Sequence, residues 1–318
     1  MLSKMIKVGL VAWAMAGAVT GVAAEAEKPA CAEKRPLKVL MIGNSFSICV
    51  LHEMPKIAAD LNLPLDICSL YIGGCSLERH MQNVKAPETK PYKISWDYVS
   101  TEKDAVPFKD LLVKGGKDGK ENRANIPEML KADAWDIVTI QQASHGSWQP
   151  ATYEPYGTQL IDTIKEAAPQ AKIVVQQTWS YTPWDKRLGD WGIDQNTMFS
   201  ALEAAYRHFA MRHGLEIIPT GKAVQAYRKQ LPVVYTEKSN DDDVCGTSTF
   251  VEKDGKWSPK GDVFHFNARG NFLQGLVWTA KLFNVDVTKG SYVPKCLENQ
   301  PERAKLMRQI ATELTCAK

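Results

Sequence analysis

From Leu37 onward, short apolar runs alternate with longer segments in which apolar residues recur every three or four positions. Short runs of apolar and β-branched residues predict buried strands, and the three-to-four spacing predicts amphipathic helices. The expected strands cover residues 38–42, 65–71, 137–141, 173–177 and 215–219. The expected helices cover residues 50–61, 156–168, 197–213, 222–231 and 269–283.

This alternation is typical of a parallel sheet that carries helices on both faces. We therefore predict a single α/β domain over residues 35–318, a three-layer α/β/α sandwich around a mostly parallel five-stranded sheet. Three segments interrupt the rhythm and are expected to be loop insertions, at about 85–125, 180–195 and 232–260. Loops of this length in a compact domain are usually functional or disordered. In the last one, a Lys-Asp-Gly turn between two strand-like runs predicts a hairpin.

The first residues of the chain predict where the protein goes. Lys4 and Lys7 precede an uncharged apolar run from Val8 to Ala24, which ends in small residues. This is the layout of a secretory signal peptide, so we expect residues 1–24 to be cleaved and the mature protein to be secreted or periplasmic. A transmembrane anchor is the competing interpretation, but the run is at the short end of what spans a bilayer. No later stretch is as long and apolar, so we expect no stable membrane insertion after processing.

Composition narrows the possible partners. The formal net charge of +3 falls to +1 when Lys4 and Lys7 are removed, too little for the electrostatic footprint of a nucleic-acid-binding protein. All seven cysteines follow the leader. An oxidising compartment permits disulfides, although an odd number leaves at least one cysteine free or paired between chains. The spacing contains no Cys-x-x-Cys and no Cys/His cluster, so we expect no metal site.

A serine follows the first expected strand directly. Residues 39–42 are apolar, Gly43 ends the run, and Ser45 comes just past its carboxyl end, before a helix. In open parallel sheets, ligands bind outside the carboxyl ends of the strands where the strand order reverses, which for an order of 2-1-3-4-5 lies beside this strand. The amides of the following helix favour developing negative charge. Taken alone, however, the segment favours a simple turn in which the serine caps the helix.

The chain carries an aspartate and a histidine far from that serine. Asp262 precedes His265 by three residues, on a short segment that leads into the last expected helix. A serine hydroxyl needs a base to take its proton, and that base needs a carboxylate to fix its tautomer and stabilise its charged form. This pair can supply both functions. By itself, an Asp-x-x-His pattern is frequent by chance.

The two ends together resemble a known family. Gly-Asn-Ser-Phe-Ser around Ser45 and the Asp262-x-x-His265 pattern look like the first and last blocks of the SGNH/GDSL hydrolase superfamily. Two middle blocks occur in the right order: residues 72–76 resemble the block whose glycine amide, here Gly74, helps form the oxyanion hole, and residues 140–145 occupy the place of the Gly-x-Asn-Asp block. The resemblance implies a flavodoxin-like SGNH fold, a Ser-His-Asp triad and no cofactor.

The chain departs from the superfamily pattern at two positions. Asn44 stands where the superfamily usually has aspartate, and the third block lacks Gly-x-Asn. Some branches that act on acetylated sugars resemble this chain in having a Gln at the end of that strand, so Gln141 or Gln142 is the candidate side-chain donor to the oxyanion. Alternation along a strand lets only one of the two face the site. At Gly74, the missing Cβ would let the backbone approach the oxyanion, although a glycine pair can also serve only as a turn.

Aromatic residues and one histidine follow the third and fourth expected strands. His145 is a candidate substrate contact because it falls in the third block, although a lone histidine in a loop is more often a hydrogen-bonding or surface residue. Trp148 and Trp179 are candidates because aromatic faces pack well against sugar rings. Large aromatic residues in long loops equally often fasten those loops to the body of a protein. Tyr181, Trp184 and Trp191 lie in the same part of the chain.

These observations predict an exported serine esterase that removes small acyl groups, acetyl in particular, from carbohydrate. Its partner would be a small-molecule or polysaccharide ester. Two alternatives stay open, namely an SGNH hydrolase of lipase or thioesterase type and a non-catalytic, glycan-binding member of the fold. Activity that depends on Ser45 separates the enzymes from the binding protein.

Overall fold

The computed structural model describes residues 35–100, 105–231, 242–246 and 249–315. The expected signal peptide, residues 1–24, lies outside the described residues. Within the part of the chain that the structure describes, no helix is long and apolar enough to cross a membrane.

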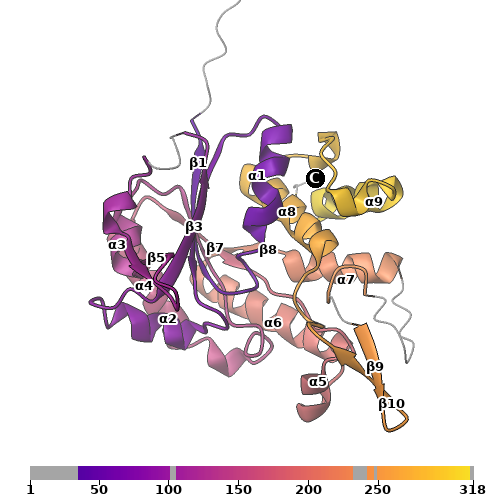
Figure 1. Cartoon of the computed structure of the whole chain (residues 1–318). Helices are drawn as coiled ribbons and strands as arrows, with labels where there is room; N and C mark the ends of the chain where they lie inside the picture. Colours follow the sequence, from indigo (N-terminus) through magenta and orange to yellow (C-terminus); the bar gives the residue numbers. More distant parts are fainter. Residues whose placement is uncertain (1–34, 101–104, 232–241, 247–248, 316–318) are drawn as a thin grey trace, which may run out of the picture. The chain divides into compact units, whose positions relative to one another are not determined.

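An eight-stranded mixed sheet forms the centre of the structure, in the order β4-β5-β3-β2-β1-β6-β7-β8 (Figure 1). The five expected strands are all present and parallel, in the order β2-β1-β6-β7-β8, which is the expected 2-1-3-4-5. Their bounds are β1 Leu37–Gly43, β2 Leu65–Tyr71, β6 Ile137–Ile140, β7 Lys172–Gln176 and β8 Glu216–Ile218. The expected five-stranded, mostly parallel sheet is therefore too small, and it describes only one part of the sheet.

The three further strands lie in the segment that was expected to be a loop, residues 85–125. They are β3 Tyr92–Tyr98, β4 Val113–Gly115 and β5 Glu121–Ala124, and they extend the sheet by antiparallel pairing. Tyr92, Ile94 and Tyr98 lie on the same side of the strand and are buried, while Lys93 points to the other side and is exposed. This alternation is a strand signal, which the Lys, Pro and Gly content of the surrounding segment obscures.

Helices cover both faces of the sheet. On one face lie α1 Val50–Asp60, α7 Thr220–Gln230, α8 Ala268–Phe283 and α9 Pro301–Thr315, and on the other lie α2 Leu77–Val84, α3 Ile126–Lys131, α4 Tyr156–Ala167 and α6 Gln195–His213 (Figure 1). The short helix α5 spans Lys186–Asp190, and single 3₁₀ turns span Lys109–Leu111, Pro150–Thr152, Val287–Lys289 and Lys295–Leu297. The five expected helices are present within two residues of their expected ends, whereas α2, α3, α5 and α9 were not expected.

Strand β1 and a separate hairpin each lie, in the sequence, just before residues expected to act chemically. The core centres on β1, whose residues from Val39 to Ile42 are almost completely buried. Helix α8 is apolar on most of its surface because it packs against α1, α7 and α9 as well as the sheet. A separate hairpin, β9 Thr249–Lys253 and β10 Lys256–Lys260, occurs where the Lys-Asp-Gly turn predicts one. The chain passes from this hairpin through Asp262 and His265 directly into α8.

Candidate active site

The carboxyl end of β1 carries Ser45 on a tight turn. Ser47 N and Ile48 N donate to Asn44 O at 3.1 and 3.2 Å, so the chain turns immediately after the strand and reaches α1 at Val50. Strand β1 lies between β2 and β6, which is where the strand order reverses. Ser45 therefore occupies the edge of the sheet at which ligands bind in this class of fold.

The Asn44 side chain joins three of the four sequence blocks. Its Nδ2 donates to Cys75 O at 2.9 Å, and its Oδ1 accepts from Phe46 N at 3.0 Å and from Gln141 Nε2 at 2.5 Å. An ionised carboxylate accepts hydrogen bonds but donates none, so an aspartate here could not satisfy Cys75 O in the same way. The asparagine thus fits the local hydrogen bonding and fixes the turn that holds Ser45.

Ser45, His265 and Asp262 form a continuous hydrogen-bonded chain. His265 Nε2 lies 2.8 Å from Ser45 Oγ, and His265 Nδ1 lies 2.5 Å from Asp262 Oδ2. The serine and the histidine are separated by 220 residues in sequence. The structure thus brings together all three residues that were expected to form a triad, in the order nucleophile, base and orienting carboxylate.

The loop from Gly261 to Phe266 places the carboxylate. Gly261 has a φ of +114°, in the region that favours glycine, and Asp262 Oδ1 then accepts from the backbone N–H groups of Phe264 and His265, both at 2.9 Å. Burial raises the pKa of Asp262, but the hydrogen bonds from the His265 side chain and these two backbone groups outweigh it and lower the pKa to about 2. The carboxylate is therefore ionised at neutral pH.

The arrangement is open to solvent. The side chains of His265 and Asp262 keep 33% and 34% of their exposed area, and Ser45 is partly exposed. A small ester can therefore reach the hydroxyl.

Two backbone N–H groups of the first two sequence blocks donate no hydrogen bond within the described residues. In the described part of the chain, no group accepts a hydrogen bond from the N–H of Ser45 or Gly74. Ile72 N donates to Gly43 O, which joins the Gly74 loop to the end of β1. A Cβ at Gly74 would meet nothing within 4 Å, so close approach, the expected reason for this glycine, is wrong. Its φ of +61° requires glycine instead.

The two candidate glutamines have different roles. Gln142 Oε1 accepts from Leu77 N at 3.0 Å and from Ala143 N at 2.8 Å, while its Nε2 donates to Thr152 O at 2.7 Å. This side chain joins α2 to the loop after β6, and both of its amide atoms are already hydrogen-bonded within the fold. These bonds argue against its expected role as a donor to the oxyanion. Gln141 contacts the Ser45 turn through Asn44, and its amide nitrogen has a second N–H to offer.

Of the expected substrate contacts, Trp179 is inaccessible. It is fully buried, its ring stacks on Phe46 and Phe266 with centroid distances of 4.1 and 3.5 Å, and its Nε1 donates to Phe264 O at 2.8 Å. The indole therefore holds the loop that carries His265, and the expectation that it touches substrate is wrong for this structure. It is one of the aromatic residues that fasten a loop.

His145 and Trp148 lie nearer the surface. His145 is exposed, and burial of its ring followed by the positive charge of Arg187 lowers its pKa. Trp148 is partly buried against Trp191, with ring centroids 5.4 Å apart. Both residues stay candidates for contact with a substrate.

Sequence reasoning missed Phe264 and Arg187. The Phe264 ring lies 4.1 Å from the His265 ring, and the Arg187 guanidinium lies 4.1 Å from the Phe264 ring. The position of Phe264 inside the Asp-x-x-His pattern could have indicated its place. No sequence signal marks Arg187, because it reaches the site through the segment 180–195 and not through a recognisable block.

The cysteines do not compete for the chemistry. Within the described residues, Cys49, Cys68, Cys75 and Cys296 are free thiols. Burial raises the pKa of Cys49 and of Cys75 to about 12, so both are protonated and unreactive at neutral pH. Across residues 35–315, apart from the undescribed gaps, no group of His, Cys, Asp and Glu could hold a metal ion.

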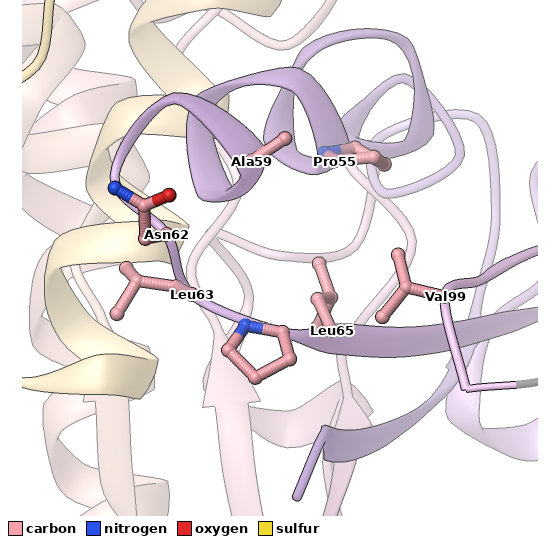
Figure 2. Close-up of a pocket in the computed structure, with 7 residues that line it drawn as sticks. Pro55, Ala59, Asn62, Leu63, Leu65 and Val99 are labelled. Carbon is pink, nitrogen blue, oxygen red and sulfur yellow. The ribbon is translucent and has the colours of Figure 1, made fainter. Parts of the chain in front are cut away.

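A hollow of about 330 Å³ lies at the opposite end of the strands. Its lining includes Leu65, the first residue of β2, whereas Ser45 follows the last residue of the parallel strand β1. In Figure 2, Pro55 and Ala59 of α1 lie across this hollow from Leu65 and Val99. The lining is Pro55, Ala59, Asn62, Leu63, Pro64, Leu65 and Val99. None of these side chains titrates, so the hollow offers no acid or base.

Comparison with known families places the chain. A family model described as a domain of unknown function, DUF4886, matches residues 38–313, which include Ser45, Asp262 and His265. The chain belongs to the DUF4886 family. A search of curated proteins gives no match.

Solved structures show the same fold. This DUF4886 protein is similar to a DUF4886 family protein from Bacteroides uniformis ATCC 8492, with a TM-score of 0.68, 24% identity, and coverage of 88% of this chain and 94% of that chain. It also matches a proposed SGNH hydrolase from Slackia heliotrinireducens (TM-score 0.48, 19% identity, 77% of this chain and 98% of that chain) and an acetyl xylan esterase (0.45, 11%, 76% and 98%). The match to the Bacteroides uniformis protein shows a shared fold. At TM-scores below 0.5, the latter two likenesses carry no weight for the chemistry of the site.

Proposed function

We propose that this DUF4886 protein is an exported serine esterase that removes small acyl groups, acetyl in particular, from carbohydrate. The observation that carries the proposal is the distance of 2.8 Å from Ser45 Oγ to His265 Nε2, in line with the bond of 2.5 Å from His265 Nδ1 to Asp262. A nucleophile, a base and an orienting carboxylate at these distances are what acyl transfer through a serine requires.

The reaction has two steps. Ser45 Oγ attacks the acyl carbon while His265 Nε2 takes its proton, and the tetrahedral intermediate collapses when the same nitrogen protonates the leaving sugar oxygen. Water then enters and attacks the acyl-serine while His265 Nε2 takes its proton. The acyl–Oγ bond breaks as His265 returns this proton to Ser45 Oγ, which releases the carboxylic acid and restores Ser45 and the neutral imidazole. Asp262 stays ionised throughout, because its pKa is lowered to about 2, and stabilises the charged imidazole.

The developing oxyanion needs donors that are already in place. The N–H groups of Ser45 and Gly74 have no acceptor within the described residues, and Gln141 supplies a side-chain N–H from the end of β6. Each such donor is worth about 10²- to 10³-fold in rate in comparable sites.

Partly exposed aromatic residues in the loops after β6 and β7 support carbohydrate as the substrate. Trp148 packs on Trp191 at a ring distance of 5.4 Å, and both remain partly exposed, which suits the apolar face of a sugar ring. Export follows from the leader-like residues 1–24, which suit a substrate outside the cytoplasm.

The first experiment compares hydrolysis of p-nitrophenyl acetate by the wild type and Ser45→Ala, with Ser291→Ala as the matched control. Ser291 is an exposed serine that bonds to Asp60. We expect Ser45→Ala to lose at least about 10³-fold in kcat and Ser291→Ala to retain the wild-type rate. Equal rates in wild type and Ser45→Ala would refute the nucleophile and leave a glycan-binding member of the fold.

The second experiment identifies the acyl group and the carrier. The wild type is incubated with acetylated polysaccharides and, separately, with long-chain p-nitrophenyl esters, and the released acids are measured. We expect acetate release from polysaccharide to exceed hydrolysis of the long-chain esters. The opposite order would assign the protein to the lipase or thioesterase type.

A further inference from the structure

The Arg187 side chain lies one ring away from the His265 imidazole. Its guanidinium carbon is 4.1 Å from the ring centroids of both Tyr181 and Phe264, and these two tilted rings are 5.2 Å apart. The guanidinium thus sits in the notch between them. Phe264 in turn lies 4.1 Å from the His265 ring. A single aromatic ring thus separates a cation from the histidine that contacts Ser45 Oγ.

Asp185 holds the guanidinium by one edge only. Arg187 Nε and Nη2 donate to the two Asp185 carboxylate oxygens at 2.8 and 2.5 Å, and Arg187 N donates to the same carboxylate at 3.0 Å. Asp185 is buried, whereas 30% of the Arg187 side-chain area is exposed. Over the residues that the structure describes, Nη1 has no hydrogen-bond partner. The side chain is therefore fixed in place with one donor edge left open.

The positive charge of Arg187 interacts with His145 and with Asp262. Burial, followed by the positive charge of Arg187, lowers the pKa of His145. Burial lowers the pKa of Arg187, but the hydrogen bond to Asp185 and the charges of Tyr181, Asp185 and Asp262 outweigh it and raise the pKa. Tyr181, Asp185, Asp262 and His145 are the titratable groups that interact electrostatically with Arg187. A lowered pKa keeps His145 neutral at neutral pH, so Arg187 is the cation on this side of the site.

A rigid guanidinium with a free edge is suited to one ligand chemistry above others. Its planar fork binds a carboxylate through two parallel N–H···O bonds, which are stronger and more directional than bonds to a neutral hydroxyl. A purely structural arginine that only fastens α5 to Phe264 would need the ring contacts and Asp185, but not the open Nη1 edge.

Resting on the esterase function proposed above, we propose that the natural substrate is an acylated acidic sugar, and that Arg187 Nη1 and Nη2 bind the carboxylate of a uronic acid residue next to the acyl ester. His145, on the same side, contacts this residue as a neutral hydrogen-bonding partner. Arg187 thereby determines specificity for the sugar without taking part in the acyl transfer.

The test compares two acetylated oligosaccharides, an oligogalacturonide that carries carboxylates and a xylo-oligosaccharide that carries none. We expect wild type to prefer the acidic substrate in kcat/KM, and Arg187→Gln to lower the ratio of the two kcat/KM values about tenfold, chiefly through KM for the acidic substrate. Arg187→Lys keeps the charge and loses the fork, so it should give a smaller loss. Lys186→Gln removes a charge from an exposed neighbour and should leave the ratio unchanged.

Several results would overturn the proposal. If Arg187→Gln lowers kcat/KM equally for both substrates, the arginine only supports the loop. If neither variant changes the ratio of the two kcat/KM values, Arg187 does not bind the carboxylate. If Arg187→Gln does not fold, as judged by circular dichroism, Arg187→Lys carries the comparison.

Binding separates this proposal from the esterase function. Calorimetry with the acetylated oligogalacturonide compares Ser45→Ala with Ser45→Ala/Arg187→Gln, in which no turnover by Ser45 occurs. We expect Kd to rise about tenfold in the double variant. If Kd rises but the wild type shows no esterase activity, the proposed reaction is refuted and the acidic-sugar site is supported. If the two Kd values are equal, the acidic-sugar site is refuted, and the esterase function is unaffected.

Discussion

The two halves of the candidate site are built in different ways. The Ser45 turn is embedded in the core: Asn44, Phe46 and Ser47 are at most 3% exposed, and Phe46 O accepts from Gln274 Nε2 at 2.8 Å. The loop from Asp262 to Phe266 is partly exposed throughout. The nucleophile is thus fixed by the sheet and by buried hydrogen bonds, whereas the base depends on a few contacts to a surface loop.

Those few hydrogen bonds come from two segments, the one that contains Trp179 and residues 244–246. Trp179 Nε1 donates to Phe264 O at 2.8 Å, Gly246 N donates to His265 O at 2.9 Å, and Asn267 N donates to Val244 O at 3.0 Å. None of these hydrogen bonds belongs to the eight-stranded sheet. Substitutions in the loop should therefore change catalysis more than stability, and substitutions around Ser45 should change both.

The largest effect is expected from His265→Ala. Without the imidazole, no group takes the proton of Ser45, so kcat on p-nitrophenyl acetate should fall at least about 10³-fold. Ser45→Ala/His265→Ala should be no slower than either single variant, because the two groups act as a unit. Multiplying losses in the double variant would show that the residues act independently.

Asp262→Asn should come next. The amide cannot stabilise the charged imidazole and no longer fixes its tautomer, so we expect kcat to fall at least about 10²-fold with little change in KM. The urea midpoint, compared with that of wild type, should change little because the side chain is one-third exposed. A large fall in stability with unchanged kcat would contradict the expectation that substitutions in the His265 loop affect catalysis more than stability.

Asn44→Asp tests the embedded half. The new carboxylate would be buried and would face Cys75 O, which now accepts from Asn44 Nδ2. We expect the free energy of unfolding to fall by about 1–3 kcal/mol, measured by urea denaturation. Unchanged stability would show that the donor to Cys75 is dispensable.

Trp179→Phe tests the contact that holds the base loop. The ring stacking is largely kept while the bond to Phe264 O is lost, so we expect about 1 kcal/mol of stability and about tenfold in kcat to be lost, with KM unchanged. As a control, Trp135→Phe removes an indole bond of 2.8 Å to Met129 O, just before the amino end of β6 and so at the opposite end of the strands from Ser45. It should lower stability without this selective loss in kcat.

The smallest effect concerns stability in acid. The folded-state pKa of Asp262 is about 2, below the ordinary 3.8, so the carboxylate stabilises the fold above the ordinary value and loses this contribution as the pH falls towards 2. The stability difference between wild type and Asp262→Asn should be constant above about pH 5 and shrink below it. A difference that does not vary with pH would contradict the lowered pKa.

The contrast between the halves also explains what the sequence could predict. The five parallel strands were predictable because buried parallel strands are continuous apolar runs. The place of the Ser45 turn was predictable because ligands in such sheets bind at the carboxyl ends of the strands. Asp262 and His265 were predictable only through their resemblance to a superfamily block. Strand β3 was missed because its alternation lies between Lys- and Pro-rich residues, and its pairing with β2 is a long-range contact that no local pattern records.

Side-chain roles in the site were harder to predict than positions. Gln142 and Trp179 were expected to meet the oxyanion and the substrate, but each is occupied by hydrogen bonds from segments distant in sequence. Arg187 was not expected at all, since only the fold brings the segment 180–195 against Phe264. Burial and partners decide such roles, and neither can be read from residue type.

The most direct test of the central claim is covalent labelling of Ser45 by an alkyl fluorophosphonate, followed by mass spectrometry of the digested protein. We expect one adduct per chain on the peptide that contains Ser45 in wild type, and labelling at least about 10²-fold slower in His265→Ala, because only a serine deprotonated by the imidazole reacts readily. An adduct on another residue, or equal labelling rates in the two proteins, would contradict the account.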